Sequence, residues 1–358
     1  MKRAHIVSTG SYLPGQPLTN TDLEELVGPL SPDLLAQVQV ERRHWLVNPT
    51  TGVHTETNSD MATKAAEQAL TFASLSAHDV DLLVLSTSSP DFPLPPMVTL
   101  VQEKLGLKRC ATIEVRSGCA GSVQALDIAR LYLEQGKYHT AVVIGCEAIS
   151  PILVPLFLHK DPETIRARDR LSVYSFGDGA AAFVLQASDE PGGIHSSSLA
   201  SVGGDRKPGM TVTAGGSKVP VPGPKERMEL RVDFQASGKF TPYILAESLT
   251  DILTTSGVSA ESIDLCIIPE GNTGYLQEEL KEAGLLTPEW VAVSGNIFEN
   301  LSLVGNTGSA ALPLALDYAW KTGHVRQGDQ LLILAIETSK WMYAGMTLTW
   351  SATPCPIA

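Results

Sequence analysis

Two stretches of the chain share one order of polar and apolar positions. Residues 75–91 (LSAHDVDLLVLSTSSPD) and residues 258–272 (VSAESIDLCIIPEGN) each pass from a polar helix end, through an Asp that follows Val or Ile, into a short apolar run. A continuous apolar run between polar flanks is typical of a strand that is buried on both faces of a parallel sheet. The pattern therefore predicts a loop that enters a buried strand in each half of the chain.

A second pair of similar stretches follows these strands in the same order. Residues 119–150 and residues 306–339 each contain small residues, an apolar helix, a Gly-containing turn and another buried strand. Two strands joined through a helix form a βαβ unit with parallel strands. We therefore expect an α/β protein with two similar halves, residues 1–190 and 191–358. The two helices are apolar all round, so we expect them to be buried between sheets.

The alignment of the halves pairs Cys119 with Asn306 as the first residues of their helices. Repeat symmetry would bring these helix starts together at the junction of the halves, where ligand sites tend to lie in such folds. Between the halves, residues 200–225 are dense in Gly and Pro. This composition predicts a long connection over the surface, which can cover a pocket.

Charge and composition limit the classes of partner. The sequence has 26 Lys and Arg against 39 Asp and Glu, a formal net charge of −13, which opposes binding to nucleic acid or an anionic membrane. The most apolar stretch, residues 141–158, contains Glu147 and two prolines, so no membrane-spanning helix is expected. The first residues carry no export signal, which favours a cytoplasmic protein. A small-molecule or protein-borne substrate is therefore expected.

The five cysteines form no CxxC motif and no Cys/His cluster, so we expect neither a disulfide framework nor a metal site. Cys119, in "SGCAGS", lies among small residues at an expected helix start. Unpaired N–H groups at a helix start lower the pKa of a thiol, and neighbouring glycines let the backbone approach a substrate. Cys119 is thus a candidate acyl-accepting nucleophile, with core packing as the alternative. Core packing is the prediction for Cys110, Cys146 and Cys266.

Several motifs together resemble the β-ketoacyl-acyl carrier protein synthase III family of the thiolase superfamily. They are "GSYLPGQPLTNTDLEE" (10–25), "ERR" (41–43), "SGCAGSVQALDIA" (117–129), "SFGDGAAAFVL" (175–185) and "GNTGSAALPLAL" (305–316). The resemblance runs through nearly the whole chain in the right order. It implies a thiolase-like fold, a homodimer, and a Cys that takes an acyl group from coenzyme A or an acyl carrier protein, with a His and an Asn assisting condensation.

The resemblance also assigns individual residues. Cys119 matches the nucleophile and Asn306 the asparagine of the family. Gly345, in "YAGMTLTW", matches the glycine whose N–H completes an oxyanion hole with that of Cys119, although the run of glycines is reduced. Leu94, with Phe92 close by, falls where one subunit reaches the acyl tunnel of its partner, and the aromatic residue usual at position 94 is absent.

The main departure from the family is at its histidine. The chain reads "IDLCIIPEGN", which places Glu270 where the family has His, and none of the eight histidines takes that position. A neutral His and an Asn can both donate to a thioester oxygen during decarboxylation of a malonyl group, whereas an ionised Glu cannot donate and would repel the malonyl carboxylate. A desolvated Glu270 can instead act as a base. The alternatives are a relic that retains only acyl binding and a structural pair with an Arg.

Two further features of the sequence bear on which acyl donor the protein uses. The family often stacks a Trp before its "ERR" region on the adenine of coenzyme A, but no Trp occurs here until Trp45, which favours a carrier-protein donor. Carrier proteins are acidic, so docking needs local positive charge. The densest basic run, "TIRARDR", offers Arg166, Arg168 and Arg170 for docking, with a solvated helix face as the alternative.

These features together predict an acyltransferase of ketosynthase III type in polyketide-like specialised metabolism. Cys119 would carry the acyl group, Asn306 would orient the second substrate and Glu270 would act as base in acyl transfer or in condensation without decarboxylation. The alternatives are decarboxylative condensation with malonyl-carrier protein, and a non-catalytic partner subunit of a heteromeric ketosynthase. No P-loop or GxGxxG motif supports a nucleotide enzyme.

Overall fold

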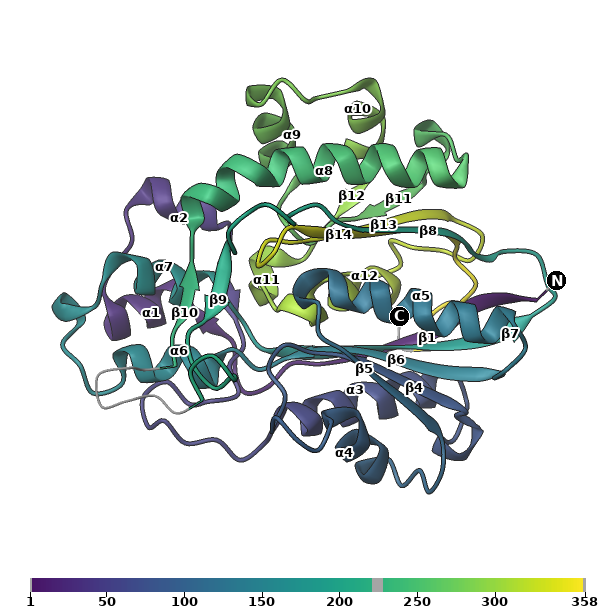
Figure 1. Ribbon diagram of the computed structural model, residues 1–358, viewed down its shortest axis with the longest axis horizontal. Coiled ribbons are helices and arrows are strands. Elements are labelled where there is room, and N and C mark those ends of the chain that lie inside the picture. Colours follow the sequence, from purple (N-terminus) through teal and green to yellow (C-terminus); the bar gives the residue numbers. More distant parts are fainter. Residues whose placement is uncertain (1, 221–227, 357–358) are drawn as a thin grey trace.

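The computed structural model describes residues 2–220 and 228–356, so residues 221–225 of the expected Gly/Pro connection lie outside the described part. Two five-stranded mixed sheets face each other across a pair of helices (Figure 1). The first sheet, in spatial order, comprises β1 (Arg3–Tyr12), β7 (Gly179–Ser188), β6 (Thr140–Glu147), β4 (Leu82–Ser86) and β5 (Ala111–Val115). The second comprises β12 (Ile297–Phe298), β11 (Leu265–Ile267), β13 (Gln330–Glu337), β14 (Met342–Thr349) and β8 (Gly193–Ser201).

The two sheets repeat one another strand for strand. β4 pairs in parallel with β5 and β6, and β11 pairs in parallel with β12 and β13. Two antiparallel strands complete each sheet, β7 and β1 in the first and β14 and β8 in the second. The expected α/β fold with two similar halves is therefore confirmed. The expected boundary at residue 190 lies between β7 and β8.

Helices form the remaining layers. In Figure 1, α5 and α12 lie between the sheets, α3 and α4 cover the outer face of the first sheet, and α8 covers the outer face of the second. The α-helices are α1 (Asn20–Val27), α2 (Pro32–Val38), α3 (Asn58–Phe72), α4 (Met97–Lys104), α5 (Gly121–Glu134), α6 (Ser150–Phe157), α7 (Ala167–Ser175), α8 (Phe234–Ser256), α9 (Thr273–Glu282), α10 (Pro288–Ser294), α11 (Leu301–Val304) and α12 (Ala311–Lys321).

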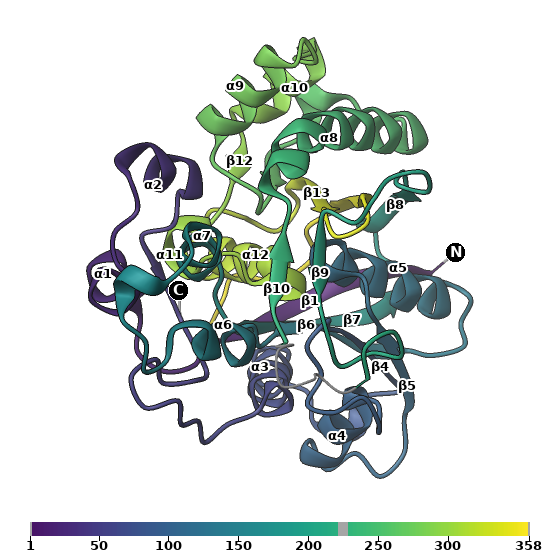
Figure 2. The same cartoon turned by 60° about the vertical axis from the view of Figure 1, so that its left-hand side comes forward.

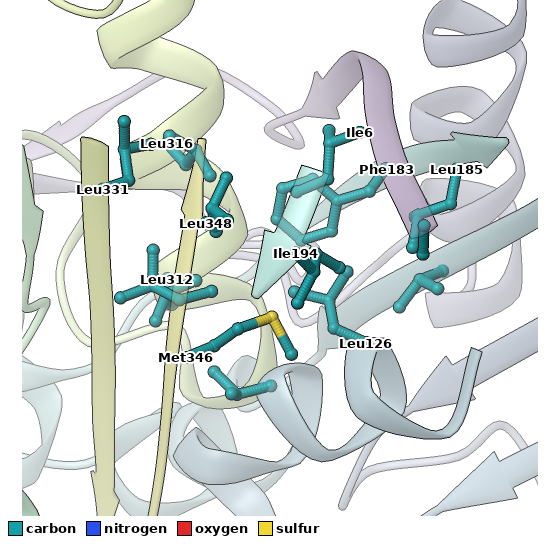
Figure 3. Packing of buried hydrophobic residues seen from close by; sticks show 14 of the residues in the cluster. Ile6, Leu126, Phe183, Leu185, Ile194, Leu312, Leu316, Leu331, Met346 and Leu348 are labelled. Atoms are coloured by element: carbon teal, nitrogen blue, oxygen red, sulfur yellow. The ribbon is translucent and has the colours of Figure 1, made fainter. Parts of the chain in front are cut away.

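The main core surrounds α5 and α12, as the apolar character of both helices predicts. Leu126 of α5 and Leu312 and Leu316 of α12 are fully buried between the sheets. Side chains from both sheets meet them, among them Ile6, Phe183, Leu185, Ile194, Leu331, Met346 and Leu348 (Figure 3). Burial of a side chain of this size contributes about 1.5–3 kcal/mol, so the positions of both helices, and of the turns that precede them, are firmly fixed.

The turns before α5 and α12 have the same conformation. Each begins with a glycine at positive φ, Gly118 at +48° and Gly308 at +53°, and continues as a 3₁₀ turn into the helix. The residue equivalent to Cys119 is therefore Ser309, and the predicted pairing of Cys119 with Asn306 as helix leaders is wrong. The sequence alignment was shifted because both turns consist of small residues that match in more than one register.

Short strands lie outside the main sheets. β2 (Leu18–Thr19) pairs with β3 (Arg42–Arg43). β9 (Met210–Val212) pairs with β10 (Leu230–Val232), as Figure 2 shows. β9 belongs to the expected Gly/Pro connection. Because residues of β9 and β10 line the cavity that contains Cys119, the described part of this connection does cover a pocket.

Candidate active site

A cavity of about 400 Å³ opens where the starts of α5 and α12 meet. Cys119 and Asn306 both line it. Its polar lining also includes Ser88, Ser89, Arg116, Ser117, Glu147, Thr211, Glu337, Ser339 and Lys340. Its apolar lining consists of Ile149, Ile152, Phe176, Met210, Val212, Leu230 and Met342. One cavity thus combines a nucleophile, carboxylates and an apolar wall.

Cys119 occupies the 3₁₀ turn Gly118–Ala120 directly before α5. Its Sγ lies 3.9 Å from Oδ1 of Asn306, so the two residues meet across the junction of the halves. The turn is tied to the other half because Ser309 Oγ donates to the carbonyl of Gly118 at 2.8 Å. The packing of α5 and this hydrogen bond together fix the position of the thiol.

Asn306 is held on its backbone and on its side chain. Its N–H donates to Ser175 O at 2.8 Å, and its carbonyl accepts from the N–H of Gly177 at 3.0 Å. Its Oδ1 accepts from the N–H of Gly308 at 3.0 Å. These bonds orient the carboxamide so that its oxygen faces the thiol.

Three glutamates surround the thiol. Glu147 and Glu337 are the last residues of β6 and β13, are buried, and line the cavity. Glu147 accepts from the N–H of Ser88 at 2.6 Å and from Ser89 Oγ at 2.5 Å. Glu270 follows β11, and the carboxylates of all three act on the charge of the Cys119 thiol.

The electrostatics of Cys119 differ from the expectation for a helix start. Burial raises the pKa of the Cys119 thiol well above its usual value, and the charges of Glu337, Glu270 and Glu147 raise it further. The predicted lowering of the pKa of this thiol is therefore wrong. The N–H of Cys119 that would have favoured a thiolate donates instead to Glu337 Oε2, at 2.5 Å. The resting thiol is neutral.

Glu270 lies beside the site but is not among the described residues that line the cavity. Its Oε1 accepts from the N–H of Ile336 at 2.7 Å, while its Oε2 is buried and has no hydrogen-bond partner within residues 2–220 and 228–356. Burial raises the pKa of Glu270 to about 8, the N–H of Ile336 opposes this rise, and the charge of Glu337 adds to it. Burial likewise raises the pKa of Glu147 to about 7.

Gly345 is not part of this site, so its assignment to the oxyanion hole is wrong. It lies in the middle of β14, opposite Leu334 and Ser198 in the neighbouring strands. A Cβ at this position would point at Ile252 of α8, on the outer face of the sheet. The backbone N–H that shares an acceptor with the N–H of Cys119 is that of Ser339, in the turn after β13, since both donate to the carboxylate of Glu337. The reduced run of glycines displaced the motif match along the sequence.

The predicted tunnel residues lie on the surface of this chain. Phe92 and Leu94 are 56% and 79% exposed in the loop between β4 and α4, and neither lines the cavity. A tunnel within the same chain is therefore excluded for both residues. Their expected role, in the tunnel of a partner subunit, stays a prediction.

The predicted docking arginines are already engaged in pairs. Arg166 contacts Asp169 at 2.6 Å and Glu229 at 3.2 Å, and Arg168 contacts the same two carboxylates at 3.6 and 3.7 Å. Arg170 donates to the carbonyl of Pro162 at 2.8 Å. Their positive charge is partly neutralised on the surface, so docking of an acidic carrier protein at this run stays a prediction.

Glu147 and Glu337 were missed as site residues, although the sequence holds a signal for them. Both stretches of the repeat end in Glu, in "GCEAIS" and "AIETS". A charged residue at the end of a fully apolar strand, in the same place in both halves, indicates a buried polar site there.

No group of three or more His, Cys, Asp and Glu side chains in the part of the chain that the structure describes could hold a metal ion. No helix there is long and apolar enough to cross a membrane. Cys146 and Cys266 are buried within β6 and β11, as expected of core residues.

The sequence of this chain is similar to those of known proteins. Residues 113–203 match the model of 3-oxoacyl-[acyl-carrier-protein (ACP)] synthase III, and residues 253–350 match the model of its C-terminal part. The chain is 30% identical over 353 residues to the β-ketoacyl-[acyl-carrier-protein] synthase III of Caldanaerobacter subterraneus subsp. tengcongensis, which covers 98% of this chain and 96% of the relative. It is 32% identical over 341 residues to the enzyme of the same name from Neisseria gonorrhoeae, which covers 94% and 96%.

Among solved structures, the tetronic acid condensing enzyme AbyA1 superposes with a TM-score of 0.83 at 26% identity, covering 97% of this chain and 99% of the other. The 3-oxoacyl-[acyl-carrier-protein] synthase III of Aquifex aeolicus superposes with a TM-score of 0.79 at 26% identity, covering 98% and 100%. The thiolase-like fold and the acyltransferase class that the motifs implied are confirmed by these likenesses. The chain belongs to the β-ketoacyl-acyl carrier protein synthase III family of condensing acyltransferases.

Proposed function

We propose that this protein transfers an acyl group to Cys119 and then joins it, without loss of CO₂, to a second substrate that Glu270 deprotonates. The acyl donor is a thioester of acyl carrier protein or coenzyme A, and the product belongs to polyketide-like specialised metabolism. The observation that carries the proposal is the buried carboxylate of Glu270, with a pKa of about 8 and a charge that acts on the nucleophile. A base is most effective when its pKa lies near the working pH.

The first half-reaction is acyl transfer to sulfur. Cys119 loses its proton and its Sγ attacks the carbonyl carbon of the donor thioester. The C–S bond to the carrier then breaks, and the carrier leaves as a thiol with the proton that Cys119 has lost. The apolar wall of the cavity, formed by residues such as Ile152, Met210 and Leu230, suits an apolar acyl chain.

The second half-reaction returns the enzyme to its starting state. The second substrate, a hydroxyl, an amine or an acidic carbon beside a carbonyl, gives a proton to Glu270 and attacks the acyl carbon. The bond to Cys119 Sγ breaks and the sulfur takes the proton from Glu270. The amide NH₂ of Asn306, opposite the Oδ1 that faces Gly308 and Cys119, orients the second substrate through its carbonyl oxygen.

Charge within the site argues against a malonyl substrate. Glu147 and Glu337 line the cavity, and Glu270 acts on the same thiol. Two like unit charges about 4 Å apart cost about 4 kcal/mol at the effective dielectric of a protein surface. A malonyl carboxylate would meet this repulsion from each glutamate that is ionised, which for Glu147 and Glu270 means above about pH 7 and about pH 8, whereas a neutral β-ketoacyl or hydroxyl substrate would not. The likeness to the tetronic acid condensing enzyme also supports a condensation reaction.

One observation favours decarboxylative condensation as the second candidate. With a pKa of about 8, Glu270 is mostly protonated at pH 7, and a protonated carboxyl group can donate to a thioester oxygen as the family's His does. The two functions predict opposite pH profiles. Catalysis by a base rises toward pH 8 and above, whereas catalysis by the protonated acid falls through the same range.

We also infer a homodimer in which Phe92 and Leu94 of one subunit reach the cavity of the other. Both side chains are apolar and exposed, and position 94 is where one subunit of this family reaches the acyl tunnel of its partner. Replacement of Leu94 by Trp should then shorten the range of acyl chains that the partner accepts. An unchanged chain-length profile would remove both residues from the proposal.

Intact-protein mass spectrometry with acyl-coenzyme A and acyl-carrier-protein donors tests the proposed function. We expect an acyl adduct on the wild type and none on Cys119→Ala, and we expect Glu270→Gln to load the acyl group but not to pass it on. Absence of an adduct with every donor would refute the proposal and revive a non-catalytic partner subunit. Release of CO₂ from malonyl-carrier protein, lost in Asn306→Ala, would select the decarboxylative alternative.

A further inference from the structure

The carboxylate of Glu337 occupies two backbone N–H groups next to the nucleophile. Its Oε2 accepts from the N–H of Cys119 at 2.5 Å, and its Oε1 accepts from the N–H of Ser339 at 2.6 Å. Glu337 is fully buried. Its Oε2 packs so closely on Gly118 that a Cβ there would be 1.6 Å away. Both oxygens of the side chain are therefore held against the turn that carries the thiol.

Two N–H groups that bind one anion beside a nucleophile have the properties of an oxyanion hole. During acylation, negative charge develops on the carbonyl oxygen of the donor thioester, and a backbone N–H aimed at that oxygen changes the rate by about 10²–10³. In the structure these N–H groups, of Cys119 and Ser339, already hold an anion. Glu337 and a thioester oxygen cannot use the same donors at the same time.

The equivalent carboxylate in the other half packs on the equivalent turn, since a Cβ on Gly308 would be 2.7 Å from Glu147 Cγ, but its hydrogen bonds differ. Glu147 ends β6 as Glu337 ends β13, but Glu147 accepts from the N–H of Ser88 and the hydroxyl of Ser89, in the loop after β4. The repeated fold therefore places a carboxylate on this turn in both halves, but the hydrogen bonds of Glu337 to the N–H groups of Cys119 and Ser339 are not a necessary result of it. These hydrogen bonds are specific to the half that faces the reactive sulfur.

Within residues 2–220 and 228–356, Glu337 forms no ion pair with a Lys or Arg side chain, including Arg116 and Lys340 of the same cavity. In its own half, the loop after β11 carries Glu270, whose like charge repels that of Glu337. Lys340 lines the same cavity, but its ammonium group donates to the carbonyls of Gly203 and Arg206. The N–H groups of Cys119 and Ser339 are consequently the donors that hold this carboxylate.

We propose that Glu337 is a built-in occupant of the oxyanion hole, which the carbonyl oxygen of the acyl donor must displace before Cys119 is acylated. This inference rests on the proposed acyl transfer to Cys119. Its consequence is selectivity, since a donor must bind well enough through its carrier arm to displace a carboxylate. Small thioesters without that arm therefore acylate the enzyme poorly, and Cys119 is protected from adventitious acylation.

Two reactions of the same sulfur test this proposal. Acylation by hexanoyl-N-acetylcysteamine, a small thioester, needs the oxyanion hole, whereas alkylation by iodoacetamide needs only the thiolate. Single-turnover rates of both are measured by intact-protein mass spectrometry for the wild type, Glu337→Ala and Glu337→Gln, with circular dichroism to check folding. Glu147→Gln is the matched comparison because it removes a carboxylate from the same cavity without freeing the N–H of Cys119.

We expect Glu337→Ala to raise the ratio of acylation rate to alkylation rate on the order of 10-fold or more, since two donors become free. Glu147→Gln should change the two rates in parallel. A parallel change in Glu337→Ala, or a fall in its acylation rate, would overturn the proposal, the latter by showing that Glu337 assists acylation. If Glu337→Ala does not fold, the ratio of acylation rate to alkylation rate in Glu337→Gln supports or overturns the proposal in the same way.

The outcome also separates this inference from the proposed function. Acylation that is detected only after removal of Glu337 supports both. Acylation of the wild type with an unchanged ratio in the variants overturns the inference and leaves the proposed function standing. Labelling of Cys119 by iodoacetamide without acylation of any variant, by this thioester or by acyl-coenzyme A, overturns both.

Discussion

Replacement of Glu270 by Gln keeps the shape of the side chain and removes its charge. The amide oxygen of Gln can still accept from the N–H of Ile336, so the local backbone should stay in place. Burial raises the pKa of Glu270 from 4.5 to about 8, which means that the folded protein keeps a proton that the unfolded chain loses near pH 4.5. The pKa of Glu270 thus differs by about 3.5 units between the folded and the unfolded state, and at about 1.4 kcal/mol per unit this corresponds to a free-energy difference of ~5 kcal/mol.

The sign of this effect follows from proton linkage. Between pH 4.5 and pH 8 the folded state binds one proton more than the unfolded state, so the free energy of unfolding falls as pH rises. Relative to the wild type, Glu270→Gln should therefore gain stability by about 1.4 kcal/mol for each pH unit in this window. Below pH 4.5 and above pH 8, the difference in free energy of unfolding between the two proteins should stay constant.

Urea unfolding at several pH values from 4 to about 9, followed by circular dichroism, measures this difference. Exposed Glu278 on α9 provides the matched control, since Glu278→Gln makes the same chemical change on a side chain in contact with water. A stability difference between Glu270→Gln and the wild type that stays flat from pH 5 to pH 8 would refute the reasoning. Glu270 would then be ionised at neutral pH in the folded protein.

Three further results are expected at the nucleophile. Gly118→Ala should lose at least about 2 kcal/mol in urea unfolding, because φ is +48° and the new Cβ would meet Glu337 Oε2 at 1.6 Å; wild-type stability would contradict this packing. The rate at which iodoacetamide alkylates Cys119 should keep rising with pH beyond the pH at which the rate for an ordinary thiol levels off, since burial and three carboxylates raise the pKa of Cys119. A rate that levels off near pH 8 would contradict this. Asn306→Ala should reduce condensation at least about 10-fold while acyl loading, followed by mass spectrometry, persists; loss of loading would instead give Asn306 a role in the first half-reaction.

The fold was predictable because its determinants are periodic and repeated. Two buried strands, at Leu82–Ser86 and Leu265–Ile267, and two apolar helices follow the same order in each half, which is enough to define the paired sheets. The register in which the two halves align was harder to predict from the sequence. Small residues allow several alignments of the two turns, and only the positive φ of Gly118 and Gly308 shows that Ser309 is the equivalent of Cys119.

The meeting of Cys119 and Asn306 was also predictable, since repeat symmetry relates the two helix starts. The electrostatics were not, because a helix start lowers the pKa of a thiol only while its N–H groups face that thiol. Here the N–H of Cys119 is taken by Glu337, a residue 218 positions away in sequence. A contact of this range depends on how the sheets are packed, so no local pattern could have indicated it.

The equivalence of Ser309 and Cys119 has a consequence for how the two halves divide their work. The hydroxyl of Ser309 accepts from Ser86 and donates to the carbonyl of Gly118, so it braces the turn that bears the thiol. The position equivalent to the nucleophile thus carries a hydroxyl that supports the reactive turn of the other half. Equivalent positions in the two halves therefore do different work: one presents the reactive sulfur, and the other holds the backbone that carries it.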